Sequence, residues 1–149
     1  MKVLATIRSS EMSPTTYTVG ALAKATDTKA IAIRHYEQVV LLPSAGRSAS
    51  GYRFYTDEER DRLLFILRSR ALGFSLDDVR ELLGFADTRD ASCAGVDAKV
   101  EGQLEQVRVR IRDLQGLESE LERLIACCEG GVIEQCRIIE SMSNRRLPC

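Results

Sequence analysis

Residues 93–128 read CAGVDAKVEGQLEQVRVRIRDLQGLESELERLIACC, and the spacing of apolar residues in this stretch predicts one long helix. The apolar positions follow one another in steps of four and three residues, with one repeated three-residue step near Gly116. They are Val100, Leu104, Val107, Ile111, Leu114, Leu117, Leu121 and Leu124. This spacing is typical of the narrow apolar stripe of a coiled coil, and no proline interrupts it.

The two ends of this predicted helix cannot meet within one chain. About 35 residues at about 1.5 Å each place Cys93 and Cys128 roughly 50 Å apart. In an antiparallel pair of such helices, Cys93 of one subunit instead lies beside Cys128 of the other. The stripe therefore predicts a dimerising helix, and we expect an antiparallel coiled coil because that pairing brings the two cysteines together.

Composition limits the remaining possibilities. The net charge of the 149 residues is −1, but residues 17–56 carry five basic and two acidic side chains, a local excess of three positive charges. Five cysteines, an odd number, argue against the disulfide framework of a secreted protein. No segment has the pattern of a signal peptide or the apolar length of a membrane span. We therefore expect a cytoplasmic protein without membrane partners, in which clustered thiols favour metal binding or redox chemistry.

Two short helices near the start of the chain predict a helix-turn-helix. Thr18 is suited to cap a helix over residues 19–25, in which we expect Leu22 and Ala25 to face inward. A second helix follows a tight turn and runs to about Gln38. Its side chains that suit phosphates or base edges are Lys29, Arg34, His35 and Tyr36.

A β-hairpin, or wing, is predicted over residues 44–55, where glycines and serines favour turns and an alternating run favours a short strand. We expect Arg47 at the tip of the hairpin and Arg53 on its return strand, where both suit phosphate contact. We also expect Tyr52 or Tyr55 to donate its hydroxyl to a nucleic-acid backbone.

Two connector helices are predicted next. Thr56 is suited to cap the first, which ends at Gly73, and Ser75 to cap the second, which ends at Gly84. The predicted divisions are a flexible extension (1–16), a winged helix-turn-helix domain with connector helices (17–84), a linker (85–95), the dimerisation helix (96–128), and a metal-binding loop, short helix and tail (129–149).

This order of elements, together with several short motifs, resembles the MerR family of transcriptional regulators. The motifs are Tyr17-Thr18-Val19-Gly20, Ile33-Arg34-His35-Tyr36-Glu37, Leu41-Leu42-Pro43, Arg47, Gly51-Tyr52-Arg53-Phe54-Tyr55 and Leu72-Gly73-Phe74-Ser75-Leu76. Ala32 departs from the family pattern, which often has a threonine there, and so does His35, where an aromatic residue is usual.

The resemblance implies a mainly α fold and a homodimer that binds a near-palindromic operator in double-stranded promoter DNA. With its effector bound, such a regulator distorts the operator so that RNA polymerase engages two misaligned promoter elements. In the metal-sensing branch, the regulated promoter serves resistance or efflux.

Three cysteines are predicted to hold a metal ion: Cys93 of one subunit, with Cys128 and Cys136 of the other. Three thiolates suit a soft cation such as Hg(II), Cd(II) or Pb(II), or Zn(II) with a fourth ligand. In the family, a cysteine at the start of the dimerisation helix marks the divalent sensors, and zinc sensors generally add a histidine in the loop. The single histidine here, His35, lies in the DNA-binding lobe, so we favour mercury, cadmium or lead over zinc. Zinc stays open because a loop carboxylate is able to complete a tetrahedron, from Glu129 or Glu134.

Other assignments stay open for the thiols. Cys127 lies one position off the apolar stripe and is a further possible ligand, whereas Cys149 has no assigned role. The alternatives for the whole protein are a redox- or thiol-reactive sensor of the same fold, a metal chaperone or thiol protein that does not bind DNA, and a structural coiled-coil adaptor. An enzyme is not expected, because a catalytic cysteine needs a neighbouring base and no histidine lies near any cysteine in the sequence.

Overall fold

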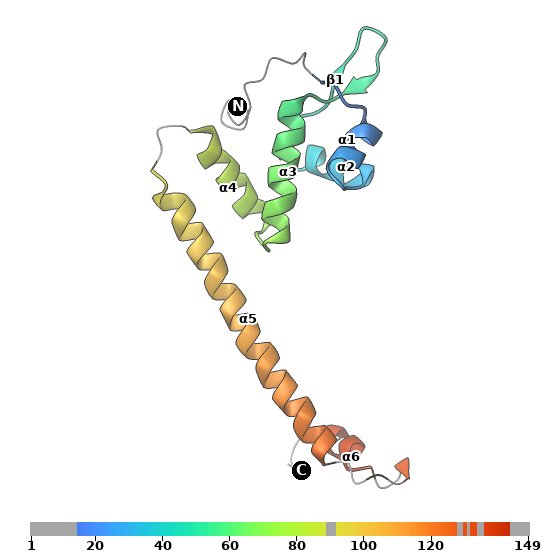
Figure 1. The fold of residues 1–149 in the computed structure, drawn as a ribbon, viewed down its shortest axis with the longest axis vertical. Helices are drawn as coiled ribbons and strands as arrows, with labels where there is room; N and C mark the ends of the chain where they lie inside the picture. Colours follow the sequence, from blue (N-terminus) through green and yellow to red (C-terminus); the bar gives the residue numbers. More distant parts are fainter. Residues whose placement is uncertain (1–14, 89–91, 128–129, 131, 134–135, 144–149) are drawn as a thin grey trace. The chain divides into compact units, whose positions relative to one another are not determined.

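The computed structural model describes residues 15–88, 92–127, 130, 132–133 and 136–143, and it is mainly helical (Figure 1). These residues divide into two compact units, one ending at Val100 and the other beginning at Glu101. The elements in chain order are α1 (Val19–Ala25), α2 (Ala30–Gln38), β1 (Gly46–Arg47), β2 (Arg53–Phe54), α3 (Asp57–Ala71), α4 (Leu76–Asp87), α5 (Ala94–Ala126) and α6 (Arg137–Ser143). The predicted fold class, a mainly α protein with a small hairpin and a long helix, is confirmed.

Helices α1 and α2 form the predicted helix-turn-helix. The Thr18 side chain accepts a backbone hydrogen bond from the first turn of α1, as its capping role requires. Leu22 and Ile33 are completely buried and join the two helices to the core. The inward orientation of Ala25 was wrongly predicted, because Ala25 is exposed and Thr26 is buried. Thr26 follows Leu22 by four residues and lies on the same face of the helix. Ala25 lies toward the edge of that buried face.

Helix α2 ends at Gln38, as predicted, and is followed by an unusual turn. Val40 has a φ of 59°, in the left-handed region that β-branched residues rarely adopt, and its side chain is 81% exposed. After this turn, Leu41 and Leu42 both enter the core, where each is 1% exposed. Their backbone N–H groups donate to the Tyr36 carbonyl.

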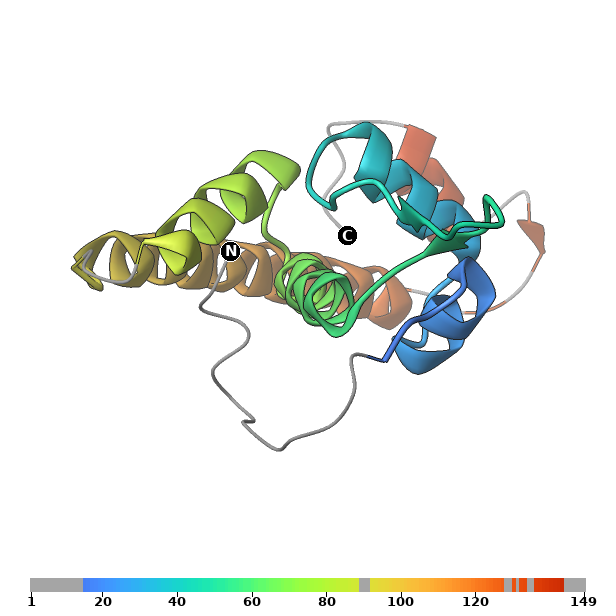
Figure 2. The same cartoon turned by 90° about the horizontal axis from the view of Figure 1, so that it is seen from above.

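The core of the first unit lies between the helix-turn-helix and the pair α3 and α4. Figure 2, in which α3 is seen nearly along its axis, shows α4 on one side of it and α1 with α2 on the other. The buried apolar side chains are Leu22, Ile33, Leu41, Leu42, Tyr55, Leu63, Ile66, Phe74, Val79, Leu82 and Leu83. Capping boxes at Thr56 with Glu59, and at Ser75 with Asp78, begin α3 and α4 at the predicted residues.

The predicted end of α4 at Gly84 is wrong, because the helix continues to Asp87. Phe85 packs against the core, and its ring lies so close to Gly95 that a Cβ added there would meet it at 2.6 Å. Val96 also packs against the core. The first turn of α5 thus belongs to the same compact unit as α4, and the segment predicted as a linker (85–95) contains parts of both helices.

The wing is present, but one arginine occupies a different place from the one predicted. Strands β1 and β2 pair antiparallel, with Gly46 opposite Phe54 and Arg47 opposite Arg53. Arg47 therefore lies in a strand and not at the tip, which residues 48–52 form. Gly46 is required because a Cβ there would meet the Phe54 ring at 2.9 Å. Figure 1 shows the connecting loop projecting from the helices of this unit.

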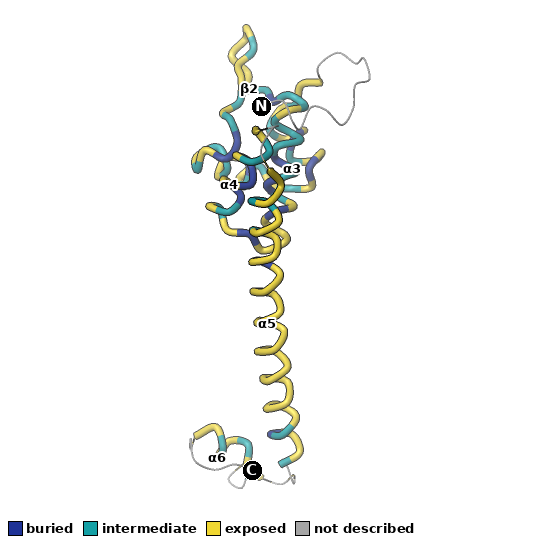
Figure 3. The backbone as a smooth tube through the Cα atoms, turned by 90° about the vertical axis from the view of Figure 1, so that its left-hand side faces the viewer, coloured by how far each residue is buried: buried dark blue, intermediate teal, exposed yellow. Residues whose placement is uncertain are grey.

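The second unit contains most of α5 together with α6. The long helix runs from Ala94 to Ala126, close to the predicted bounds of 96–128, and the short helix expected after the loop is α6. Figure 3 shows that α5 is exposed over most of its length. Among the described residues, no helix combines the length and the apolar character that a membrane crossing requires.

Candidate nucleic-acid interface and thiol site

The exposed side of α2 combines basic and apolar side chains. Arg34 and His35 are both exposed, and Ile31, one turn earlier, is 75% exposed. Tyr36 is half-buried and packs against the core, although its ring also meets the His35 ring with 5.7 Å between centroids. Lys29 is exposed at the N-cap position of α2. Of the four predicted α2 residues, Tyr36 therefore has a partly structural role, and the other three reach solvent.

The wing presents two guanidinium groups from neighbouring strands. Arg47 and Arg53 are directly opposite in the register, and both are exposed. Side chains that face each other across an antiparallel pair project on the same side of the sheet, and like charges there repel. A phosphate between two such groups removes the repulsion. Tyr52, next to Arg53, is 75% exposed.

The prediction that Tyr55 contacts a nucleic acid is wrong, because this residue belongs to the core. Tyr55 is 1% exposed, and its hydroxyl donates to Glu37 Oε1 at 3.0 Å. The same carboxylate oxygen accepts the Ala45 N–H at 3.0 Å. Burial, followed by the hydrogen bond to Glu37, raises the pKa of Tyr55 to about 12. Glu37 thus fastens both ends of the wing to α2.

A second set of contacts ties the wing to α3. Tyr17 pairs with Tyr55 through two backbone hydrogen bonds of 2.7 and 2.8 Å, and its hydroxyl donates to Asp57 at 3.0 Å. Arg60 in turn donates to the Tyr17 hydroxyl at 2.8 Å. The sequence did not connect Glu37, Asp57 or Arg60 with the wing, because Tyr55 and Tyr17, their partners in these contacts, lie far from them in the chain.

Two arginines of α3 and α4 hold the segment that follows α2. Arg62 donates to the Leu41 carbonyl at 2.7 Å, and Arg80 donates to the Val39 carbonyl at 3.1 Å. A cation at the carboxyl end of a helix also interacts favourably with the helix dipole. The end of α2 is therefore fixed to both connector helices.

Helix α4 is joined in the same way to the first turns of α5. The Lys99 ammonium lies 2.8 Å from Asp78 and 2.8 Å from Glu81. The hydrogen bond from Lys99, followed by those from Ser75, lowers the pKa of Asp78 to about 2. The hydrogen bond to Asp78, followed by that to Glu81, raises the pKa of Lys99 to about 12. Contacts thus run from α5 through α4 to the end of α2.

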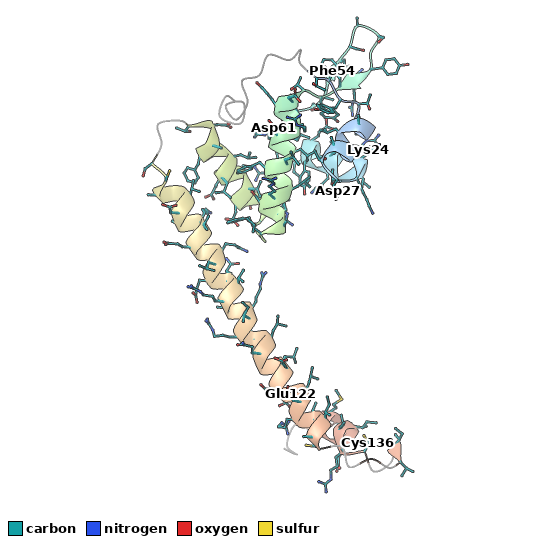
Figure 4. The ribbon with its side chains drawn as sticks, viewed as in Figure 1. Lys24, Asp27, Phe54, Asp61, Glu122 and Cys136 are labelled. Atoms are coloured by element: carbon teal, nitrogen blue, oxygen red, sulfur yellow. The ribbon has the colours of Figure 1, made fainter. Side chains whose placement is uncertain are left out.

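The described cysteines lie at the two ends of α5 and at the start of α6. Cys93 is exposed, and its carbonyl accepts the Asp97 N–H at 2.9 Å, so it directly precedes the helix as predicted. Cys127 is half-buried at the far end of α5. Cys136, labelled in Figure 4, is half-buried and its carbonyl accepts the Glu140 N–H at 3.1 Å in the first turn of α6.

The rest of the predicted thiol site is not described. Cys128 and Cys149 lie outside the described residues, as do Glu129 and Glu134. Within the described residues, no three metal-ligating side chains come together. The 33 residues of α5 correspond to a helix about 50 Å long, which separates Cys93 from Cys127 along the chain.

The apolar stripe of α5 is exposed in the single chain. Val100, Leu104, Ile111, Leu114, Leu117 and Leu121 are each between 46% and 64% exposed, and Val107 is 38% exposed. Only toward the end of the stripe does a member become buried, at Leu124, which is 9% exposed. Near that end, the helix surface carries a shallow groove lined by Leu114, Leu117, Leu121 and Ile125, with Glu118 and Glu122.

Comparison with known proteins agrees with this arrangement. The model described as "MerR HTH family regulatory protein" matches residues 17–85, and the model described as "MerR, DNA binding" matches residues 60–124. The HTH-type transcriptional regulator ZntR of Escherichia coli K12 is 35% identical over 86% of this chain and 93% of its own length. The mercuric resistance operon regulatory protein of Bacillus cereus is 34% identical over 87% of this chain and 98% of its own length.

A solved structure agrees with both the sequence and the fold. The transcription regulator PbrR691 from Ralstonia metallidurans CH34, crystallised in complex with lead(II), is 36% identical, with a TM-score of 0.75. The match covers 85% of this chain and 98% of that one. These relatives are transcriptional regulators and not enzymes. The chain belongs to the MerR family of helix-turn-helix transcriptional regulators.

Proposed function

We propose that this protein is a metal-responsive transcriptional regulator that binds promoter DNA as a homodimer and senses a soft divalent cation through thiolates shared between subunits. The observation that carries the proposal is the arrangement of α5. Its two ends bear cysteines that one chain cannot bring together, and its length bears an exposed apolar stripe.

The DNA-binding part of the proposal rests on the exposed basic groups of α2 and the wing. In a winged helix-turn-helix, the second helix enters the major groove and the wing lies over the neighbouring backbone. We assign Arg34 and His35 to the groove, and Lys29, Arg47 and Arg53 to phosphates. Of the two tyrosines expected to donate to the DNA backbone, we assign this role to Tyr52, which is exposed.

The homodimer is the occupant we propose for the α5 stripe. A chain that exposes seven aliphatic side chains along one helix gains much by burying them against an identical stripe. The antiparallel arrangement is preferred because it brings Cys93 of one subunit to the end of the partner helix, where the partner's Cys127, Cys128 and Cys136 follow in sequence.

The metal ion is proposed from the chemistry of these donors. Cys93, Cys128 and Cys136 supply three thiolates, which match soft cations, and the relatives include a mercuric resistance regulator and a lead(II) complex. We therefore favour Hg(II), Cd(II) or Pb(II) over Zn(II), with Cys127 as an alternative ligand. His35 lies on α2, where it serves DNA recognition in this scheme.

Regulation then follows from the contacts of the first unit. Metal binding at the ends of α5 alters how the two long helices sit against each other. Through Lys99, α4 and Arg80, such a change reaches the end of α2 and the operator bound to it. We propose that the metal-bound dimer distorts the operator, so that RNA polymerase engages the promoter of a resistance or efflux gene.

The test is a titration of reduced, metal-free protein with Hg(II), Cd(II), Pb(II) and Zn(II), followed by thiolate-to-metal absorption. We expect saturation at one ion per subunit, and weaker or abolished binding in Cys93→Ser, Cys128→Ser and Cys136→Ser. Cys149→Ser is the matched control and should bind as the wild type does. Unchanged binding in all three variants would exclude the thiol site and leave a regulator with another signal.

A further inference from the structure

Ile31 occupies a position at which an exposed isoleucine has no role in the fold. It is the second residue of α2, and its side chain is 75% exposed. Ile33, two positions later, is fully buried. Two residues correspond to about 200° of rotation around a helix, so the burial of Ile33 turns Ile31 away from the core.

The neighbours of Ile31 on the helix surface are the residues assigned to DNA. Residues three and four positions apart lie side by side on a helix, which places Arg34 and His35 next to Ile31. Both are exposed, as is Lys29 just before the helix. Ile31 thus adjoins the exposed basic residues that are proposed to enter the groove.

The major groove offers one apolar partner that suits such a side chain. Thymine carries its C5-methyl group there, and apolar side chains discriminate thymine through contact with this methyl. Residues in the N-terminal part of a recognition helix are also those that reach base edges. A purely phosphate-binding surface has no use for an aliphatic group in this place.

We propose that Ile31 is a specificity-determining residue that packs on a thymine methyl in each half-site of the operator. This inference rests on the proposed DNA binding and adds to it a base preference. In this arrangement, Arg34 and His35 supply polar contacts to the DNA. Ile31 contacts the thymine methyl and excludes water from that contact.

The experiment begins with full-length wild-type protein and a random-sequence duplex library, from which the protein selects its operator. Each thymine of the selected duplex is then replaced in turn by deoxyuridine, which removes only the methyl. Burial of one methyl corresponds to about a fourfold change in affinity. We expect one or more replacements per half-site to weaken wild-type binding about fourfold, and Ile31→Ala to bind both duplexes equally.

Controls separate this contact from general effects. Leu72→Ala removes an aliphatic side chain that is 66% exposed at the end of α3, and it should keep the methyl sensitivity of the wild type. Ile31→Val should keep part of it. The salt dependence of binding should not change in Ile31→Ala, because no phosphate contact is lost.

The outcomes distinguish this inference from the function on which it rests. If the library yields no preferred sequence, the proposed DNA binding fails and this inference fails with it. If an operator is selected but no thymine methyl contributes, or Ile31→Ala retains the methyl sensitivity, DNA binding stands and the role of Ile31 is refuted. A loss of dimerisation in Ile31→Ala would identify a contact between protein molecules and would also refute it.

Discussion

The two tyrosines of the wing region provide a sharp test of the interface, because sequence alone treats them alike. Tyr55 is buried and donates to Glu37, whereas Tyr52, three residues earlier, is 75% exposed. Replacing each with phenylalanine removes one hydroxyl and keeps the ring. We predict that Tyr55→Phe lowers the free energy of unfolding and leaves DNA affinity unchanged. Tyr52→Phe should lower DNA affinity and leave the free energy of unfolding unchanged.

The size of the stability loss follows from the contact of Tyr55. A hydrogen bond to a charged acceptor contributes about 1.5–3 kcal/mol. Glu37 keeps its bond from the Ala45 N–H, and the phenylalanine ring still fills the core, so the loss should fall near the lower end, at about 1.5–2 kcal/mol. The folded pKa of about 12 also exceeds the ordinary value of about 10, so this stability is present below pH 10 and lost as the pH rises toward 12. Tyr55→Phe should lack this alkaline loss.

The assay is urea unfolding at fixed protein concentration, together with binding to the selected operator below the unfolding transition. We expect Tyr55→Phe to shift the urea midpoint without changing the slope, and to bind DNA within about twofold of the wild type. Tyr52→Phe should unfold like the wild type and bind at least about threefold more weakly. Weaker DNA binding by Tyr55→Phe with unchanged stability would refute the assignment of Tyr55 to the core.

Three further predictions concern the charged contacts and the strained turn. Lys99→Met should reduce the acid-induced loss of stability that Asp78 causes as the pH falls from about 4 to about 2, because the lowered pKa of Asp78 depends first on Lys99 and only then on Ser75; acid titration of unfolding tests this, and an unchanged acid limb would contradict it. Val40→Asn should raise the free energy of unfolding by about 1 kcal/mol, because asparagine tolerates the left-handed backbone; lower stability in urea would contradict the strain. Arg53→Gln should reduce the salt slope of DNA binding by about two per dimer, about one for each subunit, without changing base preference, and an unchanged slope would exclude Arg53 from phosphate contact.

Local signals in the sequence predicted the helices well. Thr18, Thr56 and Ser75 begin three of them as expected, because capping depends on residues within one turn. The end of α4 was missed because the packing of Phe85 outweighs the cost of a glycine in the helix interior, which is about 1 kcal/mol. Such packing depends on residues distant in sequence.

The candidate site was predictable to a different extent in each of its parts. Arg34 and Arg53 are exposed as expected, but the burial of Tyr55 depends on Tyr17 and Glu37, which no pattern within the hairpin indicates. Strand β2 has only two residues, so strict alternation ends before Tyr55. For the thiols, the position of Cys93 before α5 was predictable from periodicity. Its proposed partners belong to another chain, so contacts within one subunit do not test them.

The measurement that tests the central proposal most directly uses dimers mixed from two inactive variants. Cys93→Ser and Cys136→Ser each disrupt both sites of a homodimer if every site takes Cys93 from one subunit and Cys136 from the other. In a mixed dimer, one site carries both substitutions and the other carries none. Unfolding and refolding the two variants together should therefore restore about one quarter of the wild-type capacity for Hg(II), since half of the dimers are mixed and each regains one of two sites. Recovery of that capacity would support a thiolate site shared between subunits, whereas no recovery in dimers shown to be mixed would contradict it.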